Sequence, residues 1–193
     1  VIFWPDSSTT PILKASAIVE AEYPERSQYA HLSEDTIPAL KTYATNNIST
    51  FLSDSGNGNK TVSPLNIYMA LSMLAEITDG NTRKQLLDAL GCSTIEELRT
   101  TANCIWHTNY CNAVNTTNLL ASSLWLNNNI SYNSDTLETL AGNYYASSFR
   151  GEMGSREYNA TLQNWLNEQT GDLLGDQISN ISLNPLTVIA LAT

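Results

Sequence analysis

The sequence predicts an α+β fold with about six helices and two or three strands. Between residues 36 and 170, apolar residues recur at helical spacing behind capping residues. Residues 119–127 alternate with apolar side chains on both faces, and residues 185–193 form a β-branched apolar run. We expect two buried strands there. Because the second run stops at residue 193, we also expect the fold to be incomplete within this chain.

The first 35 residues predict an extension laid over the domain rather than part of its core. Three prolines interrupt this stretch, and its polar and apolar residues are mixed. A helix is expected from Thr36, which caps it, with Pro38 in the first turn. Its apolar residues at helical spacing are Ile37, Leu40, Ala44, Ile48, Phe51 and Leu52.

The stretch "SPLNIYMALSMLAEI", residues 63–77, predicts a deeply buried helix. Ser63 is a good N-cap, and Pro64 suits the first helical position, where no N–H is required. The residues that follow leave almost no polar face, as in a helix at the centre of a larger protein. Residues 60–62, "KTV", form a short strand candidate just before it.

Four further helices are expected along the chain. The first covers residues 82–90 and ends at Gly91, and the second follows the capping box of Thr94 and Glu97 to about residue 110. The third begins at Ser134 and the fourth at Ser155. Between the last two, "SSFRGEM" is a short strand candidate. The total is about six helices and two or three strands.

Composition excludes some partners. The 193 residues contain 9 Lys and Arg against 19 Asp and Glu, giving a formal charge of −10. Nucleic acids and anionic membranes both favour clustered basic residues, so neither is expected as a main partner. No apolar run approaches the ~18 residues that a membrane span requires.

The spacing of three cysteines and one histidine allows a metal-binding site as one interpretation. Cys104, His107 and Cys111 are spaced i, i+3 and i+7 and would share a helix face, with Cys92 as a fourth ligand. Packing of two small thiols and an imidazole explains the same spacing, and we favour it. We therefore expect no metal and no cofactor.

Enzymatic chemistry is not expected either. The chain has two histidines, neither near a recognisable nucleophilic serine, and it lacks GxSxG, phosphate-loop and HExxH motifs. No catalytic residue is assigned.

Three strings, taken in order, resemble the serpin family: "NKTVSPLNIYMALSMLAEITDGNTRKQLLDALG", "NLLASSLWLNNNISYNSDTLETLAGNYYASSF", and "LQNWLNEQTGDLL" followed by "ISNISLNPLTVIALAT". The likeness covers residues 36–193 and implies the N-terminal half of a serpin domain. Such a half would have several N-terminal helices packed on part of a large central β-sheet. Residues 1–35 would be an extension, and "KASAIVEAEYPE" is similar to extensions on some bacterial members.

The resemblance implies a sheet-opening region beneath the main sheet. It places Asn59, Ser63 and Pro64 there, with Asn66 where a serine is usual and Thr193 where an asparagine is usual. For Ser63, helix capping alone remains an alternative. Other departures from the family pattern are Ser122 and Gln163, which replace asparagines, and Asp172, which replaces a glycine.

The resemblance also implies function. A secreted serpin would trap a serine or cysteine protease by inserting its reactive loop into the main sheet. That loop would lie outside this chain, and the C-terminal half would complete the fold. Two alternatives stay open: a non-inhibitory serpin acting as carrier or chaperone, and an unrelated helical surface-binding module in which residues 185–193 are helical.

Overall fold

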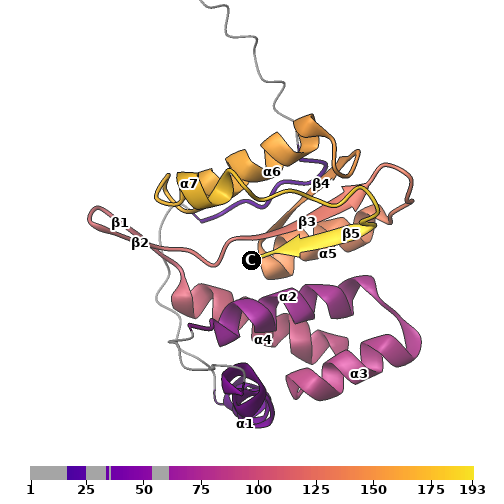
Figure 1. Ribbon diagram of the computed structural model, residues 1–193. Helices are drawn as coiled ribbons and strands as arrows, with labels where there is room; N and C mark the ends of the chain where they lie inside the picture. Colours follow the sequence, from indigo (N-terminus) through magenta and orange to yellow (C-terminus); the bar gives the residue numbers. More distant parts are fainter. Residues whose placement is uncertain (1–16, 25–33, 35, 54–60) are drawn as a thin grey trace, which may run out of the picture.

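The computed structural model describes residues 17–24, 34, 36–53 and 61–193 (Figure 1). The helices of these segments are α1 (Thr36–Leu52), α2 (Pro64–Ile77), α3 (Gly80–Leu90), α4 (Ile95–Asn109), α5 (Ser134–Tyr144), α6 (Arg156–Gln169) and α7 (Gly175–Ile178). The strands are β1 (Cys111–Ala113), β2 (Thr116–Asn118), β3 (Ser122–Asn127), β4 (Ala146–Gly151) and β5 (Ile189–Ala192). The predicted α+β class is confirmed.

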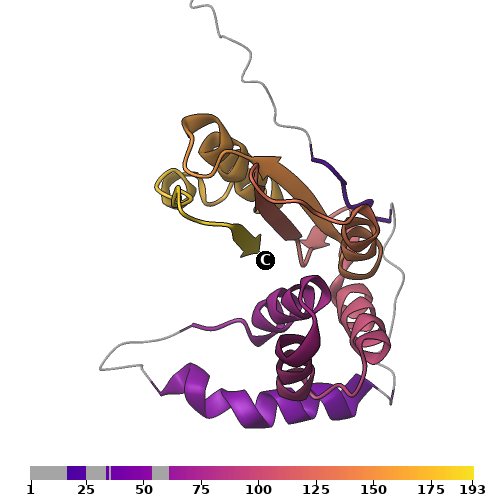
Figure 2. The same cartoon turned by 90° about the vertical axis from the view of Figure 1, so that its right-hand side faces the viewer.

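A three-stranded sheet of order β4-β3-β5 separates two helical layers. Strand β3 runs parallel to β4, with Leu124 opposite Ser148, and antiparallel to β5, with Trp125 opposite Ala190. Helices α1 to α4 lie on one side of the sheet, and α6 and α7 lie on the other (Figures 1 and 2). The expected pairing of the two long apolar runs, with a helix across them, is therefore confirmed.

Helix α2 is as buried as its sequence predicts. Every residue from Leu65 to Ile77 is buried or half-buried. Its neighbours in the same core come from α1, α3, α4, α5 and the inner face of β3, which contributes Leu124 and Leu126. An apolar helix surface needs cover on all sides, and this layer supplies much of it.

A second, smaller core joins α6 to the outer face of the sheet. The Trp125 ring stacks on Phe149 with centroids 4.2 Å apart and meets Trp165 edge to face at 6.3 Å. The Tyr158 hydroxyl donates to the Leu126 carbonyl at 3.2 Å. Alternation along β3 therefore divides its side chains between the two cores.

Residues 17–24 lie along the outer edge of β4. The Ile18 N–H donates to the Ser148 carbonyl at 2.7 Å, and the Ser148 N–H donates to the Val19 carbonyl at 2.8 Å. Tyr23 then packs on Trp106, with ring centroids 5.7 Å apart. This part of the predicted extension does lie over the domain, and the proposed boundary at residue 36 stays a prediction.

Most expected helix ends are confirmed by their caps. The Glu97 N–H donates to the Thr94 hydroxyl at 3.1 Å, and the Tyr158 N–H donates to the Ser155 hydroxyl at 3.1 Å. Gly91 ends α3 at φ +75°, where a Cβ would approach the Ala39 carbonyl to 2.8 Å. Helix α3 begins two residues earlier than expected, because the Asp79 side chain caps it.

The final strand is shorter and more exposed than expected. Strand β5 covers only Ile189–Ala192, while Leu186 and Val188 are 89% and 55% exposed. A turn at Asn184 explains the late start, since its side chain accepts from the Leu186 N–H and its carbonyl accepts from the Thr187 N–H. Because residues 189–192 are a strand, the helical-module alternative is wrong.

One smaller prediction also fails, and two observed elements were not predicted. Thr61 and Val62, the described part of the "KTV" candidate, are not in a strand. The β1–β2 hairpin and the one-turn helix α7 were not expected. The hairpin residues from Asn112 to Asn118 are exposed, so no alternation of apolar side chains marks the two strands.

Candidate functional site: the contact between α2 and β5

The structure brings four of the five predicted site residues together. Ser63, Pro64 and Asn66 form the start of α2, and Thr193 follows β5. The Thr193 hydroxyl donates to the Asn66 backbone carbonyl at 3.1 Å across 127 residues of sequence. Asn59 lies outside the described residues. The structure therefore places Thr193 beside the start of α2, and the sheet-opening role of these residues stays a prediction.

Local chemistry fixes the α2 side of this contact. Ser63 has extended backbone angles, accepts from the Asn66 N–H at 3.5 Å and donates to the Asn66 side-chain oxygen at 3.0 Å. Pro64 occupies the first helical position, and its carbonyl accepts from the Tyr43 hydroxyl of α1 at 3.2 Å. Capping is thus confirmed for Ser63, and it is compatible with a second role.

The contact consists of uncharged hydrogen-bonding groups. Ser63, Pro64 and Thr193 are exposed and Asn66 is half-buried. Within the described segments, no ion pair and no hydrogen bond to a charged side chain is found at these residues. Hydroxyl and amide groups can exchange partners, since each both donates and accepts. They suit a contact that opens and re-forms, and they have no acid–base function at neutral pH.

The other departures from the family pattern lie nearby or serve local structure. Ser122 on β3 is fully buried, and its hydroxyl has no hydrogen-bond partner in the described part of the chain. Gln163 on α6 donates to the Ile181 carbonyl at 2.7 Å. Asp172 has φ +60°, a left-handed conformation that glycine adopts more readily.

The metal-site alternative does not fit the structure. Helix α4 ends at Asn109, so Cys111 belongs to β1 and does not share a helix face with Cys104 and His107. The His107 ring instead lies 2.9 Å from the Tyr145 hydroxyl. Across the described segments, no three His, Cys, Asp or Glu side chains gather closely enough to hold a metal ion.

Sequence reasoning missed a buried charge cluster in the helical layer beneath this site. Arg99 donates two hydrogen bonds to the Glu76 carboxylate, at 2.8 and 2.6 Å, and the Tyr144 hydroxyl adds a third at 3.0 Å. Burial alone would raise the pKa of Glu76, but these hydrogen bonds and the charges of Arg99 and Arg83 outweigh it. Its pKa therefore lies below the usual value.

The signal for this cluster was present in the sequence. Glu76 is the one charged residue in the apolar stretch of residues 64–77. A charge in such a helix must find a partner, because an unpaired buried charge is very costly. Which arginine would pair with it depends on how α4 packs, and the sequence alone does not specify that.

Comparison with known proteins identifies the scaffold. Residues 38–193 match the family model described as Serpin (serine protease inhibitor). No match was found among functionally curated proteins. Within the segments that the structure describes, no helix combines the length and apolar character needed to cross a membrane.

Solved structures agree on the fold. The thermophilic serpin tengpin in its native state shares 21% identity and a TM-score of 0.73, with 93% of this chain and 45% of that chain covered. Human kallistatin shares 18% identity at a TM-score of 0.67, with 82% of this chain and 44% of that chain covered. Emu ovalbumin also shares 18% identity at a TM-score of 0.67, with 81% of this chain and 44% of that chain covered. This chain therefore spans less than half the length of the structures that it matches.

Proposed function

The chain belongs to the serpin family, and we propose that it forms the N-terminal half of an inhibitor that traps a serine or cysteine protease. The family as a whole supports protease inhibition, and the trapping mechanism is the finer part of the proposal. The sheet that receives the reactive loop would be built in part from β3, β4 and β5.

The proposed reaction begins as ordinary proteolysis. The protease nucleophile attacks a carbonyl of the reactive loop, which lies outside residues 1–193. The peptide C–N bond breaks, the new amine leaves with a proton, and an acyl-enzyme remains. The freed loop then inserts beside β5 and carries the protease with it. The active site of the protease is distorted before water can hydrolyse the acyl bond. The inhibitor is therefore consumed in the reaction and does not act as an enzyme.

The observation that carries this proposal is the hydrogen bond between Thr193 and the Asn66 carbonyl. It ties the end of β5 to the buried helix α2 at the edge of β5 where no described strand pairs. A sheet that parts beside β5 has to disturb this contact. This contact supports a sheet-opening role for Ser63, Pro64, Asn66 and Thr193, and the family resemblance alone adds Asn59. An inhibitor of this type fits a secreted or cell-surface location, where proteases are encountered.

The test uses the complete protein and a small panel of serine proteases. We expect a covalent complex that survives boiling in detergent, because the acyl bond persists once the protease is distorted. The control is the same protease with its active serine already blocked, which should give no complex. Residues 1–193 alone should also give none.

Cleavage of the complete protein by every protease in the panel, with no complex formed, would contradict the inhibitor assignment. It would favour the non-inhibitory alternative, a serpin that acts as carrier or chaperone.

A further inference from the structure

The sequence contains six Asn-x-Ser/Thr motifs, the sequence to which N-linked oligosaccharides are attached, and the structure distinguishes between them. An N-linked oligosaccharide is bulky and hydrated, so the asparagine that carries it has to lie at the surface with open space around it. Asn59 lies outside the described residues. The asparagines of the other five motifs are Asn47, Asn115, Asn129, Asn159 and Asn180.

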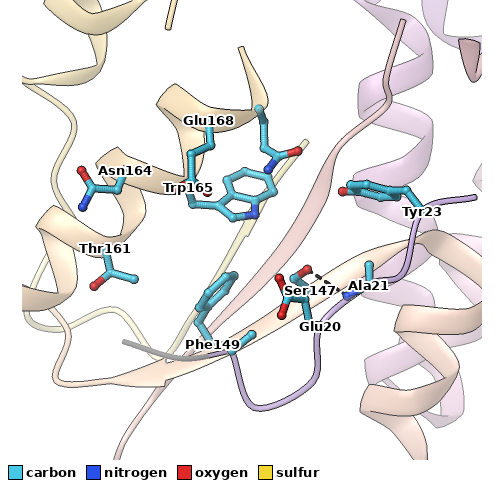
Figure 3. Close-up of a pocket in the computed structure, with 11 residues that line it drawn as sticks. Glu20, Ala21, Tyr23, Ser147, Phe149, Thr161, Asn164, Trp165 and Glu168 are labelled. Atoms are coloured by element: carbon cyan, nitrogen blue, oxygen red, sulfur yellow. Dashed lines mark hydrogen bonds between the residues drawn. The ribbon is translucent and has the colours of Figure 1, made fainter. Parts of the chain in front are cut away.

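Two of these motifs are built into helices. Asn159 on α6 is half-buried, and its side-chain oxygen accepts from the Leu183 N–H at 2.8 Å. Thr161, the third residue of this motif, is buried and lines the cavity between α6 and β4 that Figure 3 shows. Asn47 on α1 is also half-buried and donates to the Tyr43 carbonyl at 2.8 Å. A sugar on either side-chain amide would disrupt contacts that the fold already makes.

Two further motifs are exposed but held against the domain. Arg150 donates to the carbonyl of the middle residue of the Asn129 motif at 3.3 Å. Gln163 on α6 donates to the corresponding carbonyl of the Asn180 motif at 2.7 Å. Each of these motifs therefore lies next to another segment of the chain, which limits the space for a sugar.

Asn115 differs from the other four. It lies in the turn between β1 and β2, where Ala113 pairs with Thr116. The whole motif, residues 115–117, is exposed, and the adjacent Val114 is 100% exposed. In Figure 1 the hairpin projects beyond the helices and the three-stranded sheet. No described element covers this tip, so there is room for a bulky oligosaccharide.

The chain around Asn115 also lacks charge. Between His107 and Asp135 there is no charged residue, although the whole chain has a formal charge of −10. Charged side chains hydrate most protein surfaces and keep them soluble. A glycan is strongly hydrated, so at this projecting tip it would supply the solvation that charged side chains supply elsewhere.

We propose that Asn115 carries an N-linked oligosaccharide. The inference rests on the secreted or cell-surface location that belongs to the proposed function. In the transfer, the side-chain amide nitrogen of Asn115 forms a bond to C1 of a sugar held on a lipid diphosphate. The bond between C1 and the diphosphate oxygen breaks, the diphosphate leaves with the bonding electrons, and the amide loses one proton.

Peptide mapping of the complete protein, purified from its natural source, tests this site. Peptide N-glycosidase in heavy-oxygen water removes the sugar and leaves a labelled aspartate, which mass spectrometry detects at each occupied position. We expect the label at Asn115 in most molecules and no label at Asn47 or Asn159. A sample incubated without the glycosidase controls for spontaneous deamidation.

Matched variants, secreted from a eukaryotic cell, locate the attachment independently. Asn115→Gln removes the attachment residue, and Thr117→Ala removes the hydroxyl that the motif requires while keeping Asn115. Both should lose the mass of one oligosaccharide. Asn112→Gln, on the same exposed hairpin but outside any motif, should keep that mass, as should Thr117→Ser, which preserves the motif. The melting temperature of each variant reports whether it is folded.

An unlabelled Asn115 in the natural protein would overturn the inference, as would a folded Asn115→Gln protein that loses no oligosaccharide mass. A label at Asn159 would overturn the argument that exposure selects the site. Protease trapping is measured on the same preparation, which separates the two proposals. A glycosylated protein that forms no covalent complex contradicts only the inhibition, whereas a trapping protein without sugar at Asn115 contradicts only this inference.

Discussion

The two edges of the three-stranded sheet differ in how their backbone is paired. At the β4 edge, residues 17–24 supply hydrogen bonds to both the N–H and the carbonyl of Ser148. At the β5 edge, no strand pairs within the described segments, and the neighbouring Val188 and Ile189 are exposed. An unpaired edge next to apolar side chains is a template for another strand. The chain thus covers one edge with its own residues 17–24, whereas the other edge stays unpaired within the described segments.

In the proposed inhibitor this difference is functional, because the open edge is the one beside which the cleaved loop would insert. Residues 1–193 expressed alone should then associate through β5 and melt without a sharp transition. A monomeric 193-residue chain with a cooperative melt would count against this view. The predictions below test the two edges in the complete protein, except where the isolated chain is named.

The largest effect on stability should come from a substitution in the helical layer that packs beneath the sheet. Arg99→Met leaves the Glu76 carboxylate buried without its main partner, which should cost about 3 kcal/mol of the free energy of unfolding. Arg156→Met, on an exposed arginine at the start of α6, is the control and should stay within about 0.5 kcal/mol. Chemical denaturation of both variants measures the difference. Equal stability would mean that the cluster does not hold the layer together.

The same carboxylate predicts a pH dependence. Because the folded-state pKa of Glu76 lies below its usual value of 4.5, its contribution to stability is fully present above about pH 4.5. It should be lost as the pH falls through the lower folded-state pKa. Melting temperatures between pH 7 and pH 3 should fall less steeply for Glu76→Gln than for the parent. If the melting temperatures of the two proteins fall equally steeply, groups other than Glu76 cause the loss of stability in acid.

Tyr23→Ala should open the covered edge. It removes a half-buried ring that stacks near Trp106, Tyr110 and Tyr145, at a cost of about 2 kcal/mol. Tyr23→Phe keeps the ring and is the matched control. Hydrogen exchange should quicken at the Ser148 amide in the alanine variant only. Unchanged exchange would show that residues 17–24 hold the edge without Tyr23.

Thr193→Val should have a smaller effect on stability and a specific one on function. The hydroxyl and the Asn66 carbonyl form a neutral hydrogen bond, worth about 1 kcal/mol, and more if the carbonyl is left buried in the complete fold. We expect more cleaved inhibitor for each complex formed, measured as the stoichiometry of inhibition. Thr193→Ser retains the hydroxyl and should behave like the parent. If valine and serine give the same stoichiometry, Thr193 is only a strand residue.

Val188→Lys should change stability least, by under about 0.5 kcal/mol, because Val188 is exposed. In the isolated chain it should nevertheless reduce association, since a charge beside an open edge opposes strand pairing. Val114→Lys makes the same charge change on the exposed β1–β2 hairpin and is the control. Light scattering compares the two, and an equal reduction would point to net charge rather than to the edge.

Local chemistry made much of this fold predictable. Ser63, Thr94 and Ser155 cap helices where the sequence places them, since a cap depends on residues only three positions away. The covered edge and the Glu76 cluster were missed for the opposite reason. Val19 pairs with a residue 129 positions later, and Arg99 reaches Glu76 only through the packing of α4 on α2.

The sequence itself predicted only one part of the candidate site, the start of α2. A serine before a proline marks a helix start, but nothing in that pair identifies Thr193 as its neighbour. Only the resemblance to a known family connected them. The short β5 was misjudged because Asn184 and Pro185 hold a turn that overrides the strand preference of the following residues.

The division of the interior into two cores gives the molecule built-in optical reporters. Trp106 lies in the helical core, with its indole N–H donating to the Leu120 carbonyl, whereas Trp125 and Trp165 lie in the core beneath α6. Each core therefore emits from its own tryptophans. A variant that keeps only Trp106 and one that keeps only Trp125 would report whether unfolding begins in the helical layer or at α6, without any attached dye.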